Sequence, residues 1–232
     1  MPAMKTGALE ELIRILPDGI GVLPLYLDAQ VGSLEEFVGS VDAMEQRIAE
    51  LARAGMDLIH QVGAPYLMVH GLQRERELVS GWEAKYGVPV LSTGATQVEA
   101  LRALGVTRVL GVTFVEAAVN ARVAQYFRDA GLEVVQMEAL TTFSAVDRIS
   151  AREVYARIHA AYLRHPEADG IYMLGSGWRV LDIVEPLEQD LRVPVVQANA
   201  ARSWAIQNRL RVRRPIPNRG RLLADMPLPE SD

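Results

Sequence analysis

The sequence predicts an α/β protein of two pseudo-symmetric lobes, each a parallel sheet flanked by helices, with the functional site in the cleft between them. One short pattern occurs twice: DLIHQVG at residues 57–63 returns as DGIYMLG at residues 169–175. Each copy leads to a second strand-like segment, VPVLSTGA at residues 88–95 and VPVVQANA at residues 193–200. Two such units facing each other would place Gly63 and Gly175 on opposite walls of one cleft. We expect residues 1–95 and 198–232 to form the first lobe and residues 96–197 the second.

Segments of strand length alternate with segments of helical periodicity along the whole chain. The expected strands are residues 19–24, 56–62, 88–91, 108–113, 132–137, 170–174 and 193–197. The expected helices are residues 33–54, 71–86, 96–104, 117–130, 150–163, 180–191 and 200–210, followed by an irregular tail from residue 213. Strict alternation with strands rich in Val, Ile and Leu indicates parallel sheets covered on both faces.

The first long helix has the clearest start and stop signals. Ser33 and Glu36 have the form of a capping box, in which each side chain bonds a backbone N–H of the first turn. Apolar residues then recur at helical spacing, and Gly55 is expected to end the helix.

Composition excludes several classes of function. The net charge is −5, and a nucleic-acid binder needs a concentrated basic face. The basic residues at 209–214 are interpreted as a solvated face. No apolar run approaches the roughly 20 residues of a membrane span, and the N-terminus lacks the apolar stretch of a signal peptide. The chain has no cysteine, which excludes disulfides, thiolate nucleophiles and cysteine-based metal sites. We therefore expect a cytoplasmic protein.

Small or polar residues occur where the predicted strands end. In parallel sheets, ligands bind beyond the carboxyl ends of the strands. Glycines there let backbone N–H groups approach a ligand closely, although a single glycine is explained as well by the geometry of a turn. The strand ends are residues 24–26, 63–65, 92–95, 113–116, 175–178 and 197–199.

These motifs resemble the aspartate/glutamate racemase superfamily, in the branch containing arylmalonate decarboxylase and maleate cis-trans isomerase. The resemblance runs from about residue 55 to residue 204. The segments that carry it are GVP at 87–89, LRALGV at 101–106, Arg108-Val109, Asn120, DGI at 169–171, GSG at 175–177, Leu181-Asp182 and VPVV at 193–196. The resemblance implies two pseudo-symmetric lobes with the site between them.

The chain departs from this superfamily at its catalytic positions. Racemases and isomerases of the superfamily carry one cysteine on each lobe, and the decarboxylase keeps only the second. The corresponding residues here are Gly63 and Gly175, so the resemblance implies a site without its usual thiols. The pocket is altered as well, because Ala64-Pro65 replaces a Thr-Ser pair and Val115 replaces a tyrosine. Glycines at both positions are expected to free room on both walls for a bulkier ligand or an ordered water.

Two side chains are candidates for the missing acid/base. His70 follows Gly63 closely, and imidazole titrates near neutrality, although a surface or capping histidine is the alternative. His60 lies within a strand and is expected to pack in the core, and His159 and His165 lie away from the strand ends. Ser176 could donate a hydrogen bond, but no Gly-x-Ser-x-Gly elbow supports it as a nucleophile.

The remaining candidates would bind the substrate. Backbone N–H groups at Gly63, Ala64, Gly175 and Gly177 could hold an anion. Side chains that could line the same pocket are Thr113, Glu116, Asn120, Arg179 and Asn199, of which Asn120 matches an asparagine of the superfamily. No dinucleotide-binding glycine motif, Walker loop or metal-ligand spacing occurs, so we expect no cofactor.

Three functions remain open. The first is an enzyme that isomerises, racemises or decarboxylates a small carboxylic acid through an enediolate-like intermediate, with the oxyanion held at Ala64 and residues 176–177. The second is a non-catalytic protein that binds a small anion. The third is a hydratase or lyase that uses water in place of the thiol. A small carboxylate is the expected partner in each case, and the sequence leaves open whether the protein forms a homo-oligomer.

Overall fold

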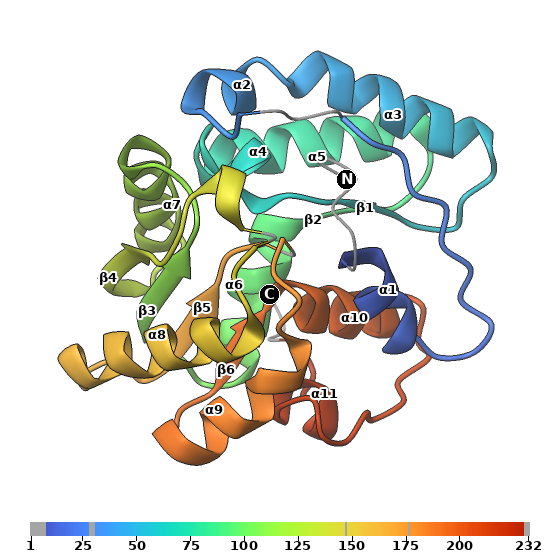
Figure 1. Cartoon of the computed structure of the whole chain (residues 1–232). Coiled ribbons are helices and arrows are strands. Elements are labelled where there is room, and N and C mark those ends of the chain that lie inside the picture. The colour runs from blue at the N-terminus through green and yellow to red at the C-terminus, as the bar shows by residue number, and fades with distance from the viewer. Residues whose placement is uncertain (1–7, 28–30, 147, 176, 230–232) are drawn as a thin grey trace.

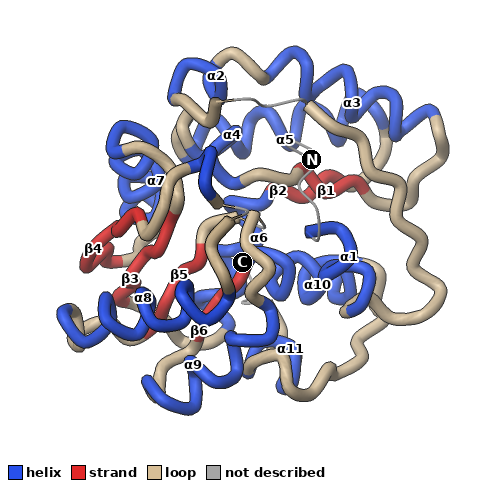
Figure 2. The backbone as a smooth tube through the Cα atoms, viewed as in Figure 1, coloured by secondary structure: helices blue, strands red, loops and turns tan. Residues whose placement is uncertain are grey.

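The computed structural model describes residues 8–27, 31–146, 148–175 and 177–229 and contains two parallel β-sheets. The strands are β1 (Ile59–Gln61), β2 (Val90–Ser92), β3 (Arg108–Thr113), β4 (Glu133–Ala139), β5 (Gly170–Met173) and β6 (Val195–Gln197). The first sheet pairs β1 with β2, and the second has the order β4-β3-β5-β6. Figures 1 and 2 show helices around both sheets, which confirms the predicted α/β class.

The helices fall into groups around the two sheets (Figure 1). Their bounds are α1 (Ala8–Arg14), α2 (Leu34–Val38), α3 (Val41–Arg53), α4 (Ala64–Met68), α5 (Leu72–Tyr86), α6 (Thr93–Ala103), α7 (Ala117–Asp129), α8 (Ala151–Arg164), α9 (Val184–Leu191), α10 (Ala198–Arg209) and α11 (Arg221–Asp225), with short 3-10 turns η1 (Phe143–Ala145) and η2 (Leu181–Ile183). Helices α3 and α5 pack with the first sheet, and α7 and α9 with the second. Helices α6 and α10 pack against each other near the centre, and α6, which follows β2 of the first sheet, also contacts β5 and β6 of the second sheet.

The internal repeat is visible in matching hydrogen bonds of the two lobes. The carboxylate of Glu83 on α5 accepts a hydrogen bond from Val90 N at 2.9 Å. The carboxylate of Glu188 on α9 accepts one from Val195 N, also at 2.9 Å. In each lobe a helix is therefore tied to the first residue of the strand that follows it. The two halves share this construction as well as their sequence pattern.

The second lobe is built on a strand whose central residues are all apolar. All residues of β3 except Arg108 are buried, and the apolar run Val109–Val112 lies between β4 and β5. A parallel strand covered on both faces requires such a run, because neither face meets water. Gly111 is needed for close packing, since a Cβ there would lie 2.1 Å from Met137 Sδ.

The prediction of a strand at residues 19–24 is wrong. These residues form no strand, and the side chains of Val22 and Leu23 are 39% and 50% exposed. The repeat predicts a partner here, because β5, the counterpart of β1, pairs on both sides, with β3 and with β6. In the described part of the chain, β1 pairs only with β2. A cavity separates residues 19–24 from the free edge of β1, so no ladder of hydrogen bonds forms.

The predicted helix at residues 33–54 is divided into α2 and α3. Ser33 caps α2 as predicted, with its hydroxyl accepting from Glu36 N at 3.2 Å. The carboxylate of Glu36 instead accepts from Gly32 N at 2.6 Å, so only half of the capping box forms. The chain turns at Gly39 and Ser40, which sit between the two helices.

Three short helices were not predicted. Helix α4 begins directly after Gly63, α1 precedes residue 19, and α11 lies in the tail that was expected to be irregular. Their brevity explains this, since five to seven residues show too little periodicity. The domain boundaries at residues 95 and 198 stay a prediction.

The equivalent ends of α5 and α9 yield a stability prediction. Gly87 ends α5 in the left-handed conformation (φ 66°, ψ 23°), and Arg192 ends α9 in the same conformation (φ 63°, ψ 18°). A side chain with a Cβ costs about 1 kcal/mol in this region. Arg192→Gly should therefore raise the free energy of unfolding by about 1 kcal/mol in urea titrations.

Gly87→Ala is the matched control for this prediction. A Cβ at residue 87 would meet nothing within 4 Å, so that substitution tests the backbone conformation alone. It should lower the free energy of unfolding by about 1 kcal/mol. Equal stability of Arg192→Gly and the unaltered protein would contradict the assigned conformation.

Candidate functional site

Gly63 and Gly175 end equivalent strands and share an unusual backbone conformation. Gly63 follows β1, has φ 106° and forms the N-cap of α4. Gly175 follows β5 and has φ 71°. Both residues are buried. Residues with a side chain rarely adopt a positive φ, so each position suits glycine for a backbone reason.

The wall at Gly175 has no room for a side chain at that residue. A Cβ placed on Gly175 would lie 2.9 Å from the ring of Phe114, and one on Gly177 would lie 3.2 Å from the same ring. The expectation that the glycines open space on both walls is therefore wrong for the second lobe. An aromatic ring occupies the volume that a side chain at residue 175 would take.

Phe114 belongs to a row of aromatic rings that crosses from one lobe to the other. Its ring lies 5.1 Å from that of Trp178 and 6.3 Å from that of Phe143, measured between centroids. Phe143 lies 6.4 Å from Phe37, which packs edge-on against Tyr66 of α4 at 4.8 Å. Such tilted and edge-on pairs stabilise beyond the area they bury. The row forms a rigid apolar surface beside Gly175 and Gly177.

Two buried polar side chains occupy equivalent positions on α6 and α10. Gln97 lies five residues after the N-cap Ser92, and Arg202 lies five residues after the N-cap Gln197. Gln97 Nε2 donates to Met173 O of β5 at 3.4 Å, which connects the helix after β2 of the first sheet to a strand of the second sheet. Gln97 Oε1 and Arg202 Nε are buried without a hydrogen-bond partner among the described residues. Sequence reasoning missed both, although the repeat relates their positions.

Asn199 is part of a network that fixes α1 to the end of β6. Its side-chain amide donates to Ala8 O at 3.1 Å and to the Glu11 carboxylate at 3.2 Å. Its carbonyl oxygen accepts from Arg202 Nη1 at 2.7 Å. Glu11 also accepts from Leu181 N at 3.1 Å, and burial raises its pKa. Asn199 was predicted to bind substrate, and here its side chain holds protein groups together.

The other predicted substrate-binding side chains have different surroundings. Thr113 donates its hydroxyl proton to Asn120 Oδ1 at 2.8 Å, so these two buried side chains satisfy each other. Glu116 is exposed and accepts from Leu34 N at 2.9 Å, which connects α7 to α2. Arg179 is exposed, and its charge only partly offsets the burial that raises the pKa of Glu11. Ser176 lies outside the described residues.

The two histidines of the first lobe differ in position. His70 follows the C-terminal end of α4, which separates it from Gly63 by about 10 Å along the helix axis. Burial and the nearby Arg74 lower its pKa, and its Nε2 has no partner among the described residues. His60 on β1 lies with Nδ1 2.9 Å from Gln61 O and Nε2 3.3 Å from Thr96 Oγ1. Burial holds the pKa of His60 well below its usual value, so it is neutral at pH 7.

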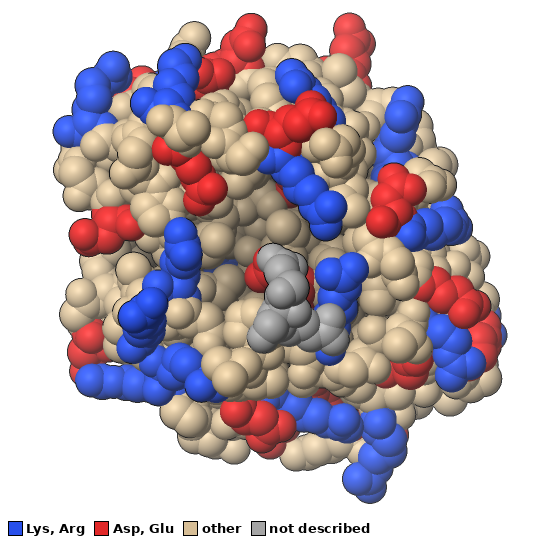
Figure 3. Space-filling model, turned by 180° about the vertical axis from the view of Figure 1, so that it is seen from behind, with Lys and Arg blue, Asp and Glu red and all other residues tan. Residues whose placement is uncertain are grey.

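Charged side chains of both signs are mixed on the face of the molecule seen from behind in Figure 3. Figure 3 shows Lys and Arg interspersed with Asp and Glu on the face opposite to that of Figure 1. In the described part of the chain, no three His, Asp or Glu side chains are grouped closely enough to hold a metal ion. The described helices include none with the length and apolar character needed to cross a bilayer.

Comparisons with known proteins agree on one group of relatives. The family model described as arylmalonate decarboxylase matches residues 27–223. Arylmalonate decarboxylase of Bordetella bronchiseptica is 26% identical over 217 residues, which cover 87% of this chain and 90% of that protein. The structure of maleate isomerase from Pseudomonas putida S16 superposes with a TM-score of 0.88 at 20% identity, covering 97% of this chain and 96% of that one.

A further structural relative reports directly on cysteine chemistry. It is a cysteine-to-serine variant of the maleate cis-trans isomerase of Nocardia farcinica, with a TM-score of 0.84 at 24% identity, covering 97% of this chain and 96% of that one. That structure carries a covalently bound succinylcysteine intermediate. The present chain has no cysteine with which to form such an adduct.

The packing at Gly175 predicts that a thiol cannot be restored there without loss of stability. Gly175→Cys combines a positive φ with a clash against Phe114, so it should lower the free energy of unfolding by about 3 kcal/mol. Chemical denaturation, with the cysteine kept reduced, measures this loss.

Substitutions at two other glycines separate the cost of a positive φ from the cost of the clash with Phe114. Gly105 has φ 73° but open space around it, so Gly105→Cys should cost only about 1 kcal/mol. Gly81 has open space and lies within α5, so Gly81→Cys should leave stability unchanged or slightly higher. Equal losses for Gly105→Cys and Gly175→Cys would show that Phe114 does not fill the space beside residue 175.

Proposed function

Because this chain belongs to the arylmalonate decarboxylase family, we propose that it is a cofactor-independent enzyme that isomerises, racemises or decarboxylates a small carboxylic acid without a catalytic thiol. Its named relatives are enzymes, an arylmalonate decarboxylase and maleate isomerases. The proposal depends most on one observation: the equivalent positions that end β1 and β5 are both glycine, in a chain without cysteine.

The proposed reaction passes through an enediolate-like intermediate. Removal of a proton or of carbon dioxide next to a carboxylate leaves a pair of electrons that spreads onto the carboxylate oxygens. Backbone N–H groups at Ala64, where α4 begins, and at Gly177 would stabilise this charge. These N–H groups need little reorganisation when the charge develops, because they are part of buried or tightly packed backbone.

The aromatic row favours a substrate with a flat apolar group. Phe114 and Trp178 lie next to the glycines that follow β5. A ring or double bond of the substrate could lie against Phe143, the partly exposed ring of the row, while its carboxylate lies at the backbone N–H groups. This surface would also exclude water, which strengthens the interactions that hold the developing charge.

Proton transfer is assigned to a group other than a thiol, and the candidates are His70 and Ser176. His70 has a lowered pKa, so it is a neutral base at pH 7. Its place at the far end of α4 argues against direct contact with a substrate at Gly63, and any direct role would require the ligand to extend along that helix. The effects of substitutions therefore decide between the two residues.

The alternative that the protein binds a small anion without catalysis is favoured by the lack of titratable side chains at the two strand ends. Gly63 and Gly175 bring no titratable side chain to the strand ends, and the polar side chains of Thr113 and Asn120 bond each other. A protein that only binds a small anion would need no more than this. Water acting in place of the thiol, as in a hydratase or lyase, is a third proposal for the same site.

The histidine assignment predicts a particular pH profile. If neutral His70 is the base, the rate should rise with pH through a pKa below the usual 6.5, because burial and Arg74 favour the uncharged ring. His70→Gln should abolish this limb and lower kcat about a hundredfold or more. His159→Gln is the control, since His159 lies on α8. An unchanged rate in His70→Gln would exclude this residue and leave Ser176→Ala as the next variant.

Solvent exchange distinguishes an enzyme from a binding protein. An enzyme of the proposed kind should incorporate deuterium from D₂O at the α-carbon of a carboxylate substrate, as observed by proton NMR over a panel of small mono- and dicarboxylates. Iodoacetamide should leave the rate unchanged, because the chain has no thiol. Stabilisation by a carboxylate in thermal unfolding without exchange, turnover or release of carbon dioxide would instead establish the binding-only function.

A further inference from the structure

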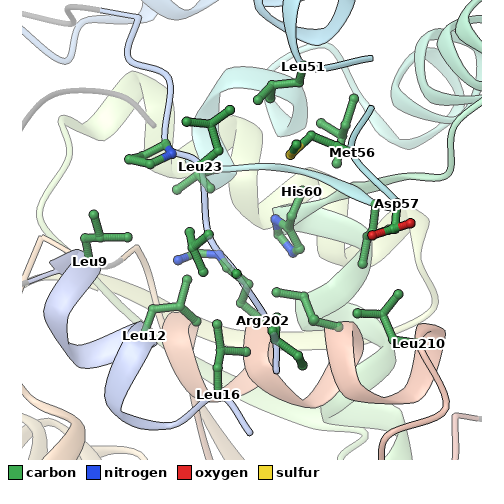
Figure 4. Close-up of a pocket in the computed structure, with 18 of the residues that line it drawn as sticks. Leu9, Leu12, Leu16, Leu23, Leu51, Met56, Asp57, His60, Arg202 and Leu210 are labelled. Carbon is green, nitrogen blue, oxygen red and sulfur yellow. The ribbon is translucent and has the colours of Figure 1, made fainter. Parts of the chain in front are cut away.

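A cavity of about 380 Å³ lies beside the free edge of β1. It is enclosed by α1, by α10, by β1 and by residues 18–25, the segment that forms no strand (Figure 4). Its volume is within the range of small-molecule sites. The residues that line it are Leu9, Leu12, Leu16, Asp18, Gly19, Ile20, Gly21, Val22, Leu23, Pro24, Leu25, Leu51, Met56, Asp57, Leu58, Ile59, His60, Val62, Arg202, Ile206, Leu210 and Val212.

The cavity contains one buried cation. The Arg202 side chain rises from α10 towards the space below His60 (Figure 4), and Arg202 is 2% exposed. Its Nη1 donates to Asn199, while its Nε has no hydrogen-bond partner in the part of the chain that the structure describes. Among the described residues, no carboxylate forms an ion pair with it. The nearest acid in its hydrogen-bond network, Glu11, is reached only through Asn199.

A buried guanidinium without a counter-ion is costly to the folded state. Burial lowers the pKa of Arg202 to about 10, so it remains charged at neutral pH. His60, which faces the same space, is neutral at that pH, as its lowered pKa shows. The other ionisable groups of the lining are Asp18 and Asp57. Asp57 is exposed and lies beyond His60 as seen from Leu9 (Figure 4). Among the described residues, Arg202 is therefore the one charged basic side chain that lines the cavity, and no described carboxylate forms an ion pair with it.

The rest of the lining is apolar. Leucines of α1 line one side, and Leu51, Met56 and Leu210 lie on the opposite side (Figure 4). Leu23 stands at the border of the cavity and is half exposed. An elongated apolar group could be buried between these side chains, with a gain of about 25 cal/mol for each Å² removed from water.

We propose that this cavity is a second binding site, which takes a medium-chain carboxylic acid with its carboxylate on Arg202 and its hydrocarbon chain among the leucines. The charged head supplies the missing counter-ion, and the chain fills the apolar volume. Neither Gly63 nor Gly175 lines this cavity, although the neighbouring Val62 does, and the proposal does not depend on the proposed function.

Isothermal titration with octanoate at pH 7 tests the site directly. Octanoate should bind at one saturable site and raise the temperature of thermal unfolding. Octanol, which has the same chain without the charge, should bind at least about tenfold more weakly, because one charge-assisted hydrogen bond contributes about a factor of ten or more. Acetate should not bind, because it has the charge without the hydrocarbon chain.

Variants assign the contacts. Arg202→Met removes the charge while keeping a flexible side chain, and it should weaken octanoate about tenfold or more while changing octanol by no more than about twofold. Leu23→Asp puts a negative charge at the border of the cavity and should also weaken the binding of octanoate. Because Leu23 is half exposed, the fold should tolerate this substitution. Leu163→Asp is the matched control on α8, where Leu163 is 66% exposed, and should bind octanoate normally.

Three results would overturn the proposal. The first is the absence of saturable octanoate binding. The second is equal octanoate affinity in Arg202→Met and the unaltered protein, provided that circular dichroism shows the variant folded. If that variant does not fold, Leu23→Asp decides in its place. The third is an equal loss in Leu23→Asp and Leu163→Asp, which would indicate non-specific adsorption. A further outcome is that octanoate binds as expected while no carboxylate of the panel is turned over. That result would support this site and count against the proposed enzyme.

Discussion

The contact between α6 and α10 is the constraint on which the rest of the molecule depends. Each of these helices follows the last strand of one lobe's repeat, and they pack against each other at the centre. Since both begin at strand ends, their packing places the carboxyl ends of the two sheets near one boundary. Gln97 adds a hydrogen bond from α6 to the end of β5. The lobes are therefore held together through the same elements that position Gly63, Gly175 and their neighbours.

The chain has no thiol, and the packing beside Gly175 leaves no room for one there. Phe114 fills the volume beside Gly175, and its ring belongs to a row that continues through Phe143 and Phe37 to Tyr66 in the first lobe. A residue with a side chain at 175 would have to displace this ring and adopt a positive φ. The second-lobe position is therefore stabilised as glycine by its surroundings, and the chemistry of this protein has to be sought in backbone groups and apolar surface.

Some buried polar groups in this fold have hydrogen-bond partners among the described residues, and others have none. Thr113 and Asn120 bond each other, and Asn199 connects Glu11 to Arg202. Arg202 nevertheless keeps an unpartnered Nε beside an apolar cavity. Unsatisfied buried donors are rare in folded proteins because each costs about 1–3 kcal/mol. Other buried donors, such as Trp178 Nε1 and Gln197 Nε2, are also unpartnered among the described residues, so it is the charge of Arg202 together with the cavity that indicates a ligand.

Local pattern and repetition in the sequence were sufficient to determine the α/β class, most strands and long helices, and the equivalence of Gly63 with Gly175. These features follow from side-chain periodicity and turn chemistry, which act over a few residues. Only the tertiary structure decided the outcome at residues 19–24, because a strand needs a partner whose distance no local pattern specifies. The same holds for Phe114, which lies far from Gly175 in sequence and fills its space, and for Arg202, whose burial depends on α1, β1 and α10 meeting around it. Contacts between segments remote in sequence, which local periodicity does not encode, determined which of the predicted positions have room for a ligand.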